Sequence, residues 1–129
     1  MPNLLVIFNH TITPSQKTDA RQTLKAEEII QPPEELCRLW AQVPPEADSL
    51  GDYLEPLKYW LDSQAGNGDY VLIQGEFGAT YLMVRFALAR GLVPLYSTTR
   101  REAEEEVLGD GTVQVRHRFF HVRFRYFGQ

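Results

Sequence analysis

The stretch YVLIQGEFGAT, residues 70–80, decides the fold. Tyr70–Gln74 is a short apolar run without alternation, which indicates a strand buried on both faces of a parallel sheet. Gly75–Thr80 then predicts a glycine-containing turn, and the mostly apolar segment Ala79–Arg90 predicts a helix that ends at Gly91. A strand, a turn and a helix in direct succession are typical of doubly wound α/β folds.

The residues before this stretch predict a second buried strand and the crossover that follows it. Leu4–Phe8 is another continuous apolar run. Thr13-Pro14-Ser15-Gln16 has the spacing of a capping box with a proline in the first turn, which predicts a helix running to about Leu24. The other expected elements are a short strand over Glu27–Ile30, a helix over Pro33–Trp40, and a helix over Leu50–Ser63 that kinks or starts later at Pro56.

After Gly91 the pattern changes from buried runs to alternation. Leu92–Ser97 predicts one more buried strand. Glu102–Leu108 and Thr112–Arg118 flank Asp110-Gly111, a dipeptide favoured in hairpin turns, and apolar residues alternate with arginines on to Tyr126. We therefore expect a single domain over residues 1–129, a doubly wound, mostly parallel α/β sheet with a C-terminal β-hairpin extension.

Composition and charge limit the classes of protein. The 129 residues, 43% hydrophobic and 23% charged, suit one globular domain. The N-terminal apolar run is too short for a signal peptide or a membrane span, so we expect a cytoplasmic protein without membrane contact. A net charge of -4 argues against binding to long duplex nucleic acid. Residues 85–129 nevertheless carry 8 arginines and no lysine, and arginine suits phosphate recognition.

The chemistry is expected where the strand order reverses. If Leu4–Phe8 is the central strand, the loops Asn9-His10-Thr11 and Gly75–Thr80 meet at its carboxyl end. Free amides at the start of a helix suit a phosphate, although the turn lacks the P-loop and dinucleotide patterns and a purely structural turn is the alternative. His10 is a candidate proton carrier there, or else a hydrogen-bonded loop residue.

A third candidate contributor is Ser97–Arg101, which is expected at the carboxyl end of the neighbouring strand. Its hydroxyls and paired arginines suit an anion clamp or, alternatively, a solvated strand end. The other histidines are scattered, so we expect no metal site and no Ser/His/Asp arrangement. By period two, His121 is predicted on the side of Arg123, in a structural or interface role. The one cysteine, Cys37, is predicted to be a packed thiol.

Four motifs together resemble a known group of proteins: FNHTITP (residues 8–14), QGEFGATY (74–81), PLYSTTRR (94–101) and FFHVRFRYF (119–127). They resemble the small stand-alone CRISPR-associated proteins of type III systems, which have a CARF-like Rossmann fold and include ring nucleases. The resemblance implies a homodimer that binds a cyclic oligoadenylate across its two-fold axis. It also implies cleavage of that messenger without a metal or other cofactor, which switches off the antiviral response.

The chemistry fits that reading, because a ribose 2′-hydroxyl can attack its own phosphate if the protein holds it in line. The expected catalytic residues are His10, Thr11 and Arg100. The expected ligand-binding residues are Asn9, Gln74, Gly75, Glu76, Phe77, Gly78, Ala79, Thr80, Tyr81, Thr98 and Thr99, with Phe77 and Tyr81 either contacting adenine or packing in the core. Two alternatives stay open: a protein that sequesters the messenger without cutting it, and a flavodoxin-like mononucleotide-binding or interaction module.

Overall fold

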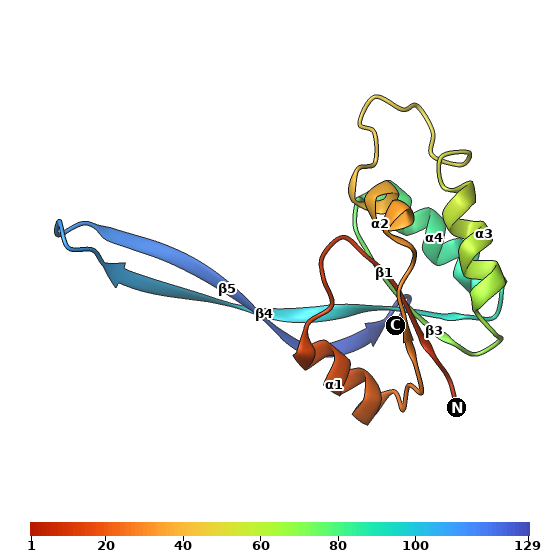
Figure 1. Ribbon diagram of the computed structural model, residues 1–129, viewed down its shortest axis with the longest axis horizontal. Coiled ribbons are helices and arrows are strands. Elements are labelled where there is room, and N and C mark those ends of the chain that lie inside the picture. Colours follow the sequence, from red (N-terminus) through yellow and green to blue (C-terminus); the bar gives the residue numbers. More distant parts are fainter.

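The computed structural model describes residues 1–129 and confirms an α/β architecture built on a five-stranded, mostly parallel sheet (Figure 1). The strand order is β2-β1-β3-β4-β5, which puts β1 between β2 and β3 as predicted. β1, β2, β3 and β4 run parallel, and β5 runs antiparallel to β4. The strands are β1 (Leu4–Phe8), β2 (Ile29–Ile30), β3 (Tyr70–Gln74), β4 (Val93–Val107) and β5 (Val113–Tyr126).

Helices cover both faces of the sheet, which explains why β1 and β3 are apolar without alternation. Leu4 and Val6 of β1 pack in the cluster on the α1 side, whereas Leu5 and Ile7 pack in the cluster formed with α2, α3 and α4. None of the helices is long and apolar enough to cross a membrane. The helices are α1 (Pro14–Thr23), α2 (Glu34–Ala41), α3 (Glu55–Gln64) and α4 (Phe77–Ala89).

Several local signals act as predicted. Thr13 and Gln16 form the capping box that starts α1. α3 takes the later of the two predicted starts, because Pro56 lies in its first turn, where a missing N–H costs nothing. Gly91 ends the segment after α4 with a φ of 73°, a left-handed conformation that favours glycine.

Two expectations about β4 are wrong. Leu92–Ser97 and Glu102–Leu108 are not separate strands but parts of β4, which runs unbroken over 15 residues. Ser97–Arg101 therefore lies inside a strand and not in a loop at a strand end. The reason is that these residues pair with residues of β5. The pairing continues past an irregularity, a register shift between Thr98 and Thr99.

Beyond this shift the two strands leave the body of the protein as a long ribbon, here called the arm (residues 99–120) (Figure 1). Every residue from Thr99 to Phe120 is exposed. At its far end, the predicted turn is confirmed, with Gly111 at a φ of 86°. The structure thus consists of a packed body, where two helical layers enclose the sheet, and an arm with neither face covered.

Candidate functional site

A cavity of about 900 Å³ opens at the carboxyl ends of β1 and β3, between the loop after β1 and the root of the arm. This is the edge of the sheet at which open α/β proteins bind ligands. Ser15, Gln16 and the aromatic residues Phe8, Phe119 and Phe120 also line it. The cavity brings together these predicted site residues: Asn9, His10, Thr11, Gln74, Gly75, Phe77, Thr80 and Thr99.

The two predicted loops do meet. The amide of Asn9 donates to the carbonyl oxygen of Gln74 at 3.2 Å, which joins the ends of β1 and β3. His10 and Thr11 are exposed at this edge, and the His10 ring packs edge-on against Phe8 with 5.5 Å between ring centroids. An imidazole and a hydroxyl are therefore available to a molecule in the cavity.

The helix end that was predicted to cradle a phosphate is already capped by the chain itself. The carboxylate of Glu76 accepts hydrogen bonds from the amides of Gly78 and Ala79, the second at 3.2 Å. This cap starts α4 at Phe77, two residues before the predicted start at Ala79. Gly78 has no positive φ, and Ala79 is buried in the core. An anion would reach these amides only by displacing the Glu76 carboxylate.

Gly75 is explained by packing. A Cβ at this position would lie 2.6 Å from Nε1 of Trp40, inside the distance that atoms tolerate. The indole N–H of Trp40 donates to the carbonyl oxygen of Gln74 at 2.8 Å. The glycine therefore lets the buried Trp40 ring pack against the end of β3.

Three side chains on α4 differ in what they offer a ligand. Phe77 is 94% exposed and Tyr81 is 61% exposed, so core packing, one of the two readings for these residues, is wrong for both. Phe77 lines the cavity, whereas Tyr81 does not and has Arg85 over its ring. The hydroxyl of Thr80, a residue that lines the cavity, is buried without a hydrogen-bond partner.

Of the third predicted contributor, Ser97–Arg101, only Thr99 lines the cavity. Thr98 is paired within the sheet, since its hydroxyl donates to the Arg123 carbonyl oxygen at 3.0 Å and accepts from the Arg123 amide at 3.2 Å. Arg100 is exposed on the arm and is absent from the cavity lining. The cavity lining consequently contains no lysine or arginine, and its ionisable side chains are His10, His121 and the phenol of Tyr96.

A buried polar chain behind the cavity was missed. His121 Nδ1 lies 2.5 Å from the Ser97 hydroxyl, and His121 Nε2 lies 2.6 Å from a carboxylate oxygen of Asp19. Gln16 donates to the Ser97 hydroxyl at 3.2 Å, and the Ser97 amide donates to the Gln74 side chain at 2.8 Å. The chain links α1, β3, β4 and β5 at the root of the arm.

The hydrogen-bond directions follow from the partners. The Asp19 carboxylate accepts from Nε2–H of His121, and in the neutral imidazole this leaves Nδ1 to accept from the Ser97 hydroxyl. Ser97 is only 5% exposed and is not part of the cavity lining, so this arrangement fixes the root of the arm and does not present a nucleophile.

Sequence reasoning missed the chain because alternation was counted through the register shift. Thr98 pairs with Arg123 and Thr99 pairs with His121, so Val122 is the extra residue. His121 and Arg123 therefore lie on opposite faces, and the prediction that they share one is wrong. No group of three or more His, Cys, Asp or Glu side chains is placed to hold a metal ion.

Comparison with known proteins finds a matching family model and a similar protein. A family model described as "Uncharacterized protein MJ1673 family" matches residues 2–125. The chain is similar to "Uncharacterized protein MJ1673" from Methanocaldococcus jannaschii, with 46% identity over 125 residues, which are 97% of this chain and 96% of the relative. No solved structure matches the chain.

Proposed function

The chain belongs to the MJ1673 family, and we propose that it binds a cyclic oligoadenylate in the cavity at the ends of β1 and β3 and cleaves it without a metal. Cyclic tetra-adenylate is the ring to test first. The observation that carries the proposal is this cavity, because it gathers polar groups from both predicted loops at the edge where α/β sheets bind nucleotides. Together with the resemblance of the four motifs, this gives a cytoplasmic ring nuclease of type III CRISPR signalling.

The lining suits adenosine units. Phe77, Phe119 and Phe120 present aromatic rings on which adenine can stack, at about 1–3 kcal/mol for each stacked base. Asn9, Gln74 and Thr99 add hydrogen-bonding groups for base edges and ribose hydroxyls. A site of this composition recognises bases and sugars and leaves the phosphates near the exposed loop after β1.

Cleavage needs positioning and two proton transfers, one from the attacking 2′-hydroxyl and one to the leaving 5′-oxygen. The 2′-hydroxyl of one ribose attacks the adjacent phosphorus, the bond to the 5′-oxygen breaks, and a 2′,3′-cyclic phosphate and a 5′-hydroxyl form. In this proposal His10, which lines the cavity, accepts the proton of the 2′-hydroxyl or protonates the leaving oxygen, and water carries the other proton. Thr11, beside it, orients the phosphate.

Sequestration without cleavage is the second candidate, and two observations favour it. Glu76 occupies the amides at the start of α4, and Arg100 lies outside the cavity lining. Both remove groups that would stabilise charge developing on a phosphate. A protein with such a site binds the messenger and releases it unchanged.

The deciding experiment incubates purified protein with cyclic tetra-adenylate in the presence of a chelator and identifies the products by mass spectrometry. Cleavage gives linear products that end in a 2′,3′-cyclic phosphate, whereas sequestration leaves the ring intact but bound. His10→Ala is expected to keep binding within a few fold and to lower the single-turnover rate by roughly 100-fold. An unchanged rate would remove His10 from the mechanism.

Arg100→Ala tests the predicted anion contact separately. Arginine that contacts a phosphate strengthens binding before and during the reaction, so its removal would weaken affinity and slow cleavage together. AMP and FMN serve as competitors. If they bind as tightly as the ring, the cavity is a mononucleotide site and the proposal is wrong.

A further inference from the structure

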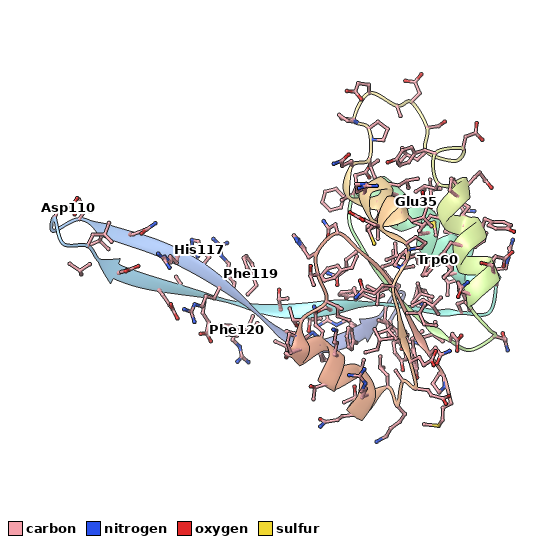
Figure 2. The ribbon with its side chains drawn as sticks, in the orientation of Figure 1. Glu35, Trp60, Asp110, His117, Phe119 and Phe120 are labelled. Atoms are coloured by element: carbon pink, nitrogen blue, oxygen red, sulfur yellow. The ribbon has the colours of Figure 1, made fainter.

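The arm has two faces of different character. Residues directly opposite each other on β4 and β5 lie on the same face of the ribbon. One face, called the apolar face, runs from Thr99/His121 at the root through Ala103/His117 in the middle to Val107/Val113 at the tip. Figure 2 shows His117 and Phe119 pointing to one side of the ribbon and Phe120 to the other.

On the opposite face, two ion pairs form within the arm. Arg116 pairs with Glu106 at 3.3 Å, and Arg118 pairs with Glu104 at 3.2 Å. The apolar face has no such internal partner for its large side chains, because Val107 is 73% exposed, Phe119 is 65% exposed and Val115 is 52% exposed. A ribbon of two strands is marginally stable in water by itself, so this face needs a cover.

The charged residues on the apolar face indicate which surface can cover it, namely the same face of a second copy. Arg101 and Glu105 lie two residues on either side of Ala103, and on β5 Phe119 and Val115 lie two residues on either side of His117. When two such faces meet antiparallel about an axis through Ala103, each Arg101 lies opposite Glu105 of the other copy. Each Phe119 then lies opposite Val115 of the other copy. An interface between identical copies requires such self-complementarity.

We propose that the apolar faces of two arms pack antiparallel, about a two-fold axis through Ala103 and His117, and thereby join two copies of this chain. Other registers are worse. Moving the axis to Arg101 or to Glu105 sets like charges against each other, which costs rather than stabilises. The ion pairs on the opposite face are undisturbed in the paired state.

This register places the tip of each arm over the root of the other. Val107 then covers Thr99, which lines the cavity of the partner copy, and Val113 lies beside His121, whose ring is already buried between Ser97 and Asp19 of its own chain. The cavity mouth is therefore completed by a second chain. The two cavities lie at opposite ends of the paired arms, so each copy holds its own ligand, which differs from the ring bound across the two-fold axis that the resemblance implies. Only this last statement rests on the proposed function.

Charge reversal tests the register. Wild-type protein should sediment as a dimer at micromolar concentration. Arg101→Glu and Glu105→Arg should each raise the dimer dissociation constant about tenfold or more, because each change acts twice per dimer. The double variant restores both ion pairs and should return the dissociation constant to within a few fold of wild type. Arg118→Glu, on the opposite face, is the matched control and should leave it unchanged.

A cross-link tests the axis directly. In a Cys37→Ser background, Ala103→Cys should form an intermolecular disulfide on mild oxidation, since the two residues 103 meet at the axis. Glu104→Cys, which faces the other way, should not. Circular dichroism of every variant checks that the arm is still folded.

The outcomes are separable. A monomeric wild type, or single charge reversals that leave the dimer intact, overturns the proposal, and a monomer also leaves the apolar face to a different kind of partner. A dimer without the charge rescue means another register and overturns it too. The proposed function fails differently, through absence of binding to cyclic tetra-adenylate by a protein that still dimerises. Calorimetry adds a stoichiometry of one ring per chain if both proposals hold.

Discussion

β3 and the outer part of β4 belong to one sheet and differ in almost everything else. Val71, Leu72 and Ile73 of β3 are completely buried, because helices pack on both faces of the sheet there. From Thr99 outward β4 has a single neighbouring strand and no buried residue. The body is stabilised by burial of apolar surface, whereas the arm depends on cross-strand hydrogen bonds, ion pairs and a tight turn.

The cavity lies where these two regions meet, and each supplies what its packing allows. The body contributes the carboxyl ends of β1 and β3 and small polar residues from the loops that follow these buried strands. The arm contributes large aromatic residues that no core has absorbed, such as Phe119 and Phe120. A change in the body should therefore alter stability first, and a change in the arm should alter association or binding first.

The largest effect is expected from removing a core side chain of the body. Leu72→Ala should lower the free energy of unfolding by about 2–5 kcal/mol, because Leu72 is fully buried and leaves a cavity. Val115→Ala, on the arm, should change it by about 0.5 kcal/mol or less when the chain is monomeric. Denaturant unfolding at low protein concentration measures both. Equal losses would mean that the arm is part of the cooperative core.

A smaller effect is expected from adding one carbon. Gly75→Ala should cost about 1–3 kcal/mol, because the new Cβ meets the Trp40 ring. Gly109→Ala in the arm is the control, since nothing lies within 4 Å of a Cβ there and its φ is not left-handed. Thermal melts of both variants give the comparison. If Gly75→Ala keeps full stability but loses ligand binding, Gly75 approaches the ligand and its role is not packing.

The body was predictable because its signals are local or act through burial. The capping box at Thr13 and the apolar run at Leu4–Phe8 each specify one conformation, and the structure adopts it. Pro56 allowed a kink or a later helix start, and the structure has the later start. The length of β4 was not predictable in the same way. The sequence Thr98-Thr99-Arg100-Arg101 suits a strand end or a strand interior equally well, and only pairing with β5 decides between them.

The site was predictable in its place but not in its details. The carboxyl ends of β1 and β3 follow from topology, so the gathering of His10, Gln74 and Thr80 could be expected. The capping role of Glu76 depends on a side-chain rotamer, and the position of His121 depends on one extra residue in β5. Such facts follow from tertiary packing and leave no periodic signal in the sequence.

β5 carries one histidine in the body, His121, and one in the arm, His117, so the two regions can be compared on a single strand. His121 is buried between Ser97 and Asp19, so His121→Ala removes one hydrogen bond from each of them and should cost about 1–3 kcal/mol. His117 is exposed and meets only Arg101, so His117→Ala should cost about 0.5 kcal/mol or less in the monomer. Urea unfolding of the two variants tests this. A similar cost for both would show that the buried chain contributes nothing to the root of the arm.

The smallest effect on stability is expected at the tip of the arm, where the residues are exposed and bury no apolar surface. Thr112 donates to a carboxylate oxygen of Asp110 from its hydroxyl at 2.6 Å and from its amide at 2.9 Å, and these bonds lower the pKa of Asp110 below its ordinary value of 3.8. Because the folded pKa lies below the unfolded one, the stabilisation is complete above the unfolded pKa. It is lost as the pH falls through the folded pKa.

An NMR titration of the Asp110 carboxyl carbon should accordingly give a midpoint below 3.8. Hydrogen exchange at Gly111 and Thr112, corrected for the intrinsic effect of pH, should quicken as Asp110 takes up its proton. The amides of β3 should be unaffected, because the turn is joined to the body only through the exposed ribbon. Asp110→Ala removes the acceptor and should abolish the pH response. A titration midpoint at the ordinary value would mean that the turn is held by Gly111 and the cross-strand ladder alone, without the aspartate.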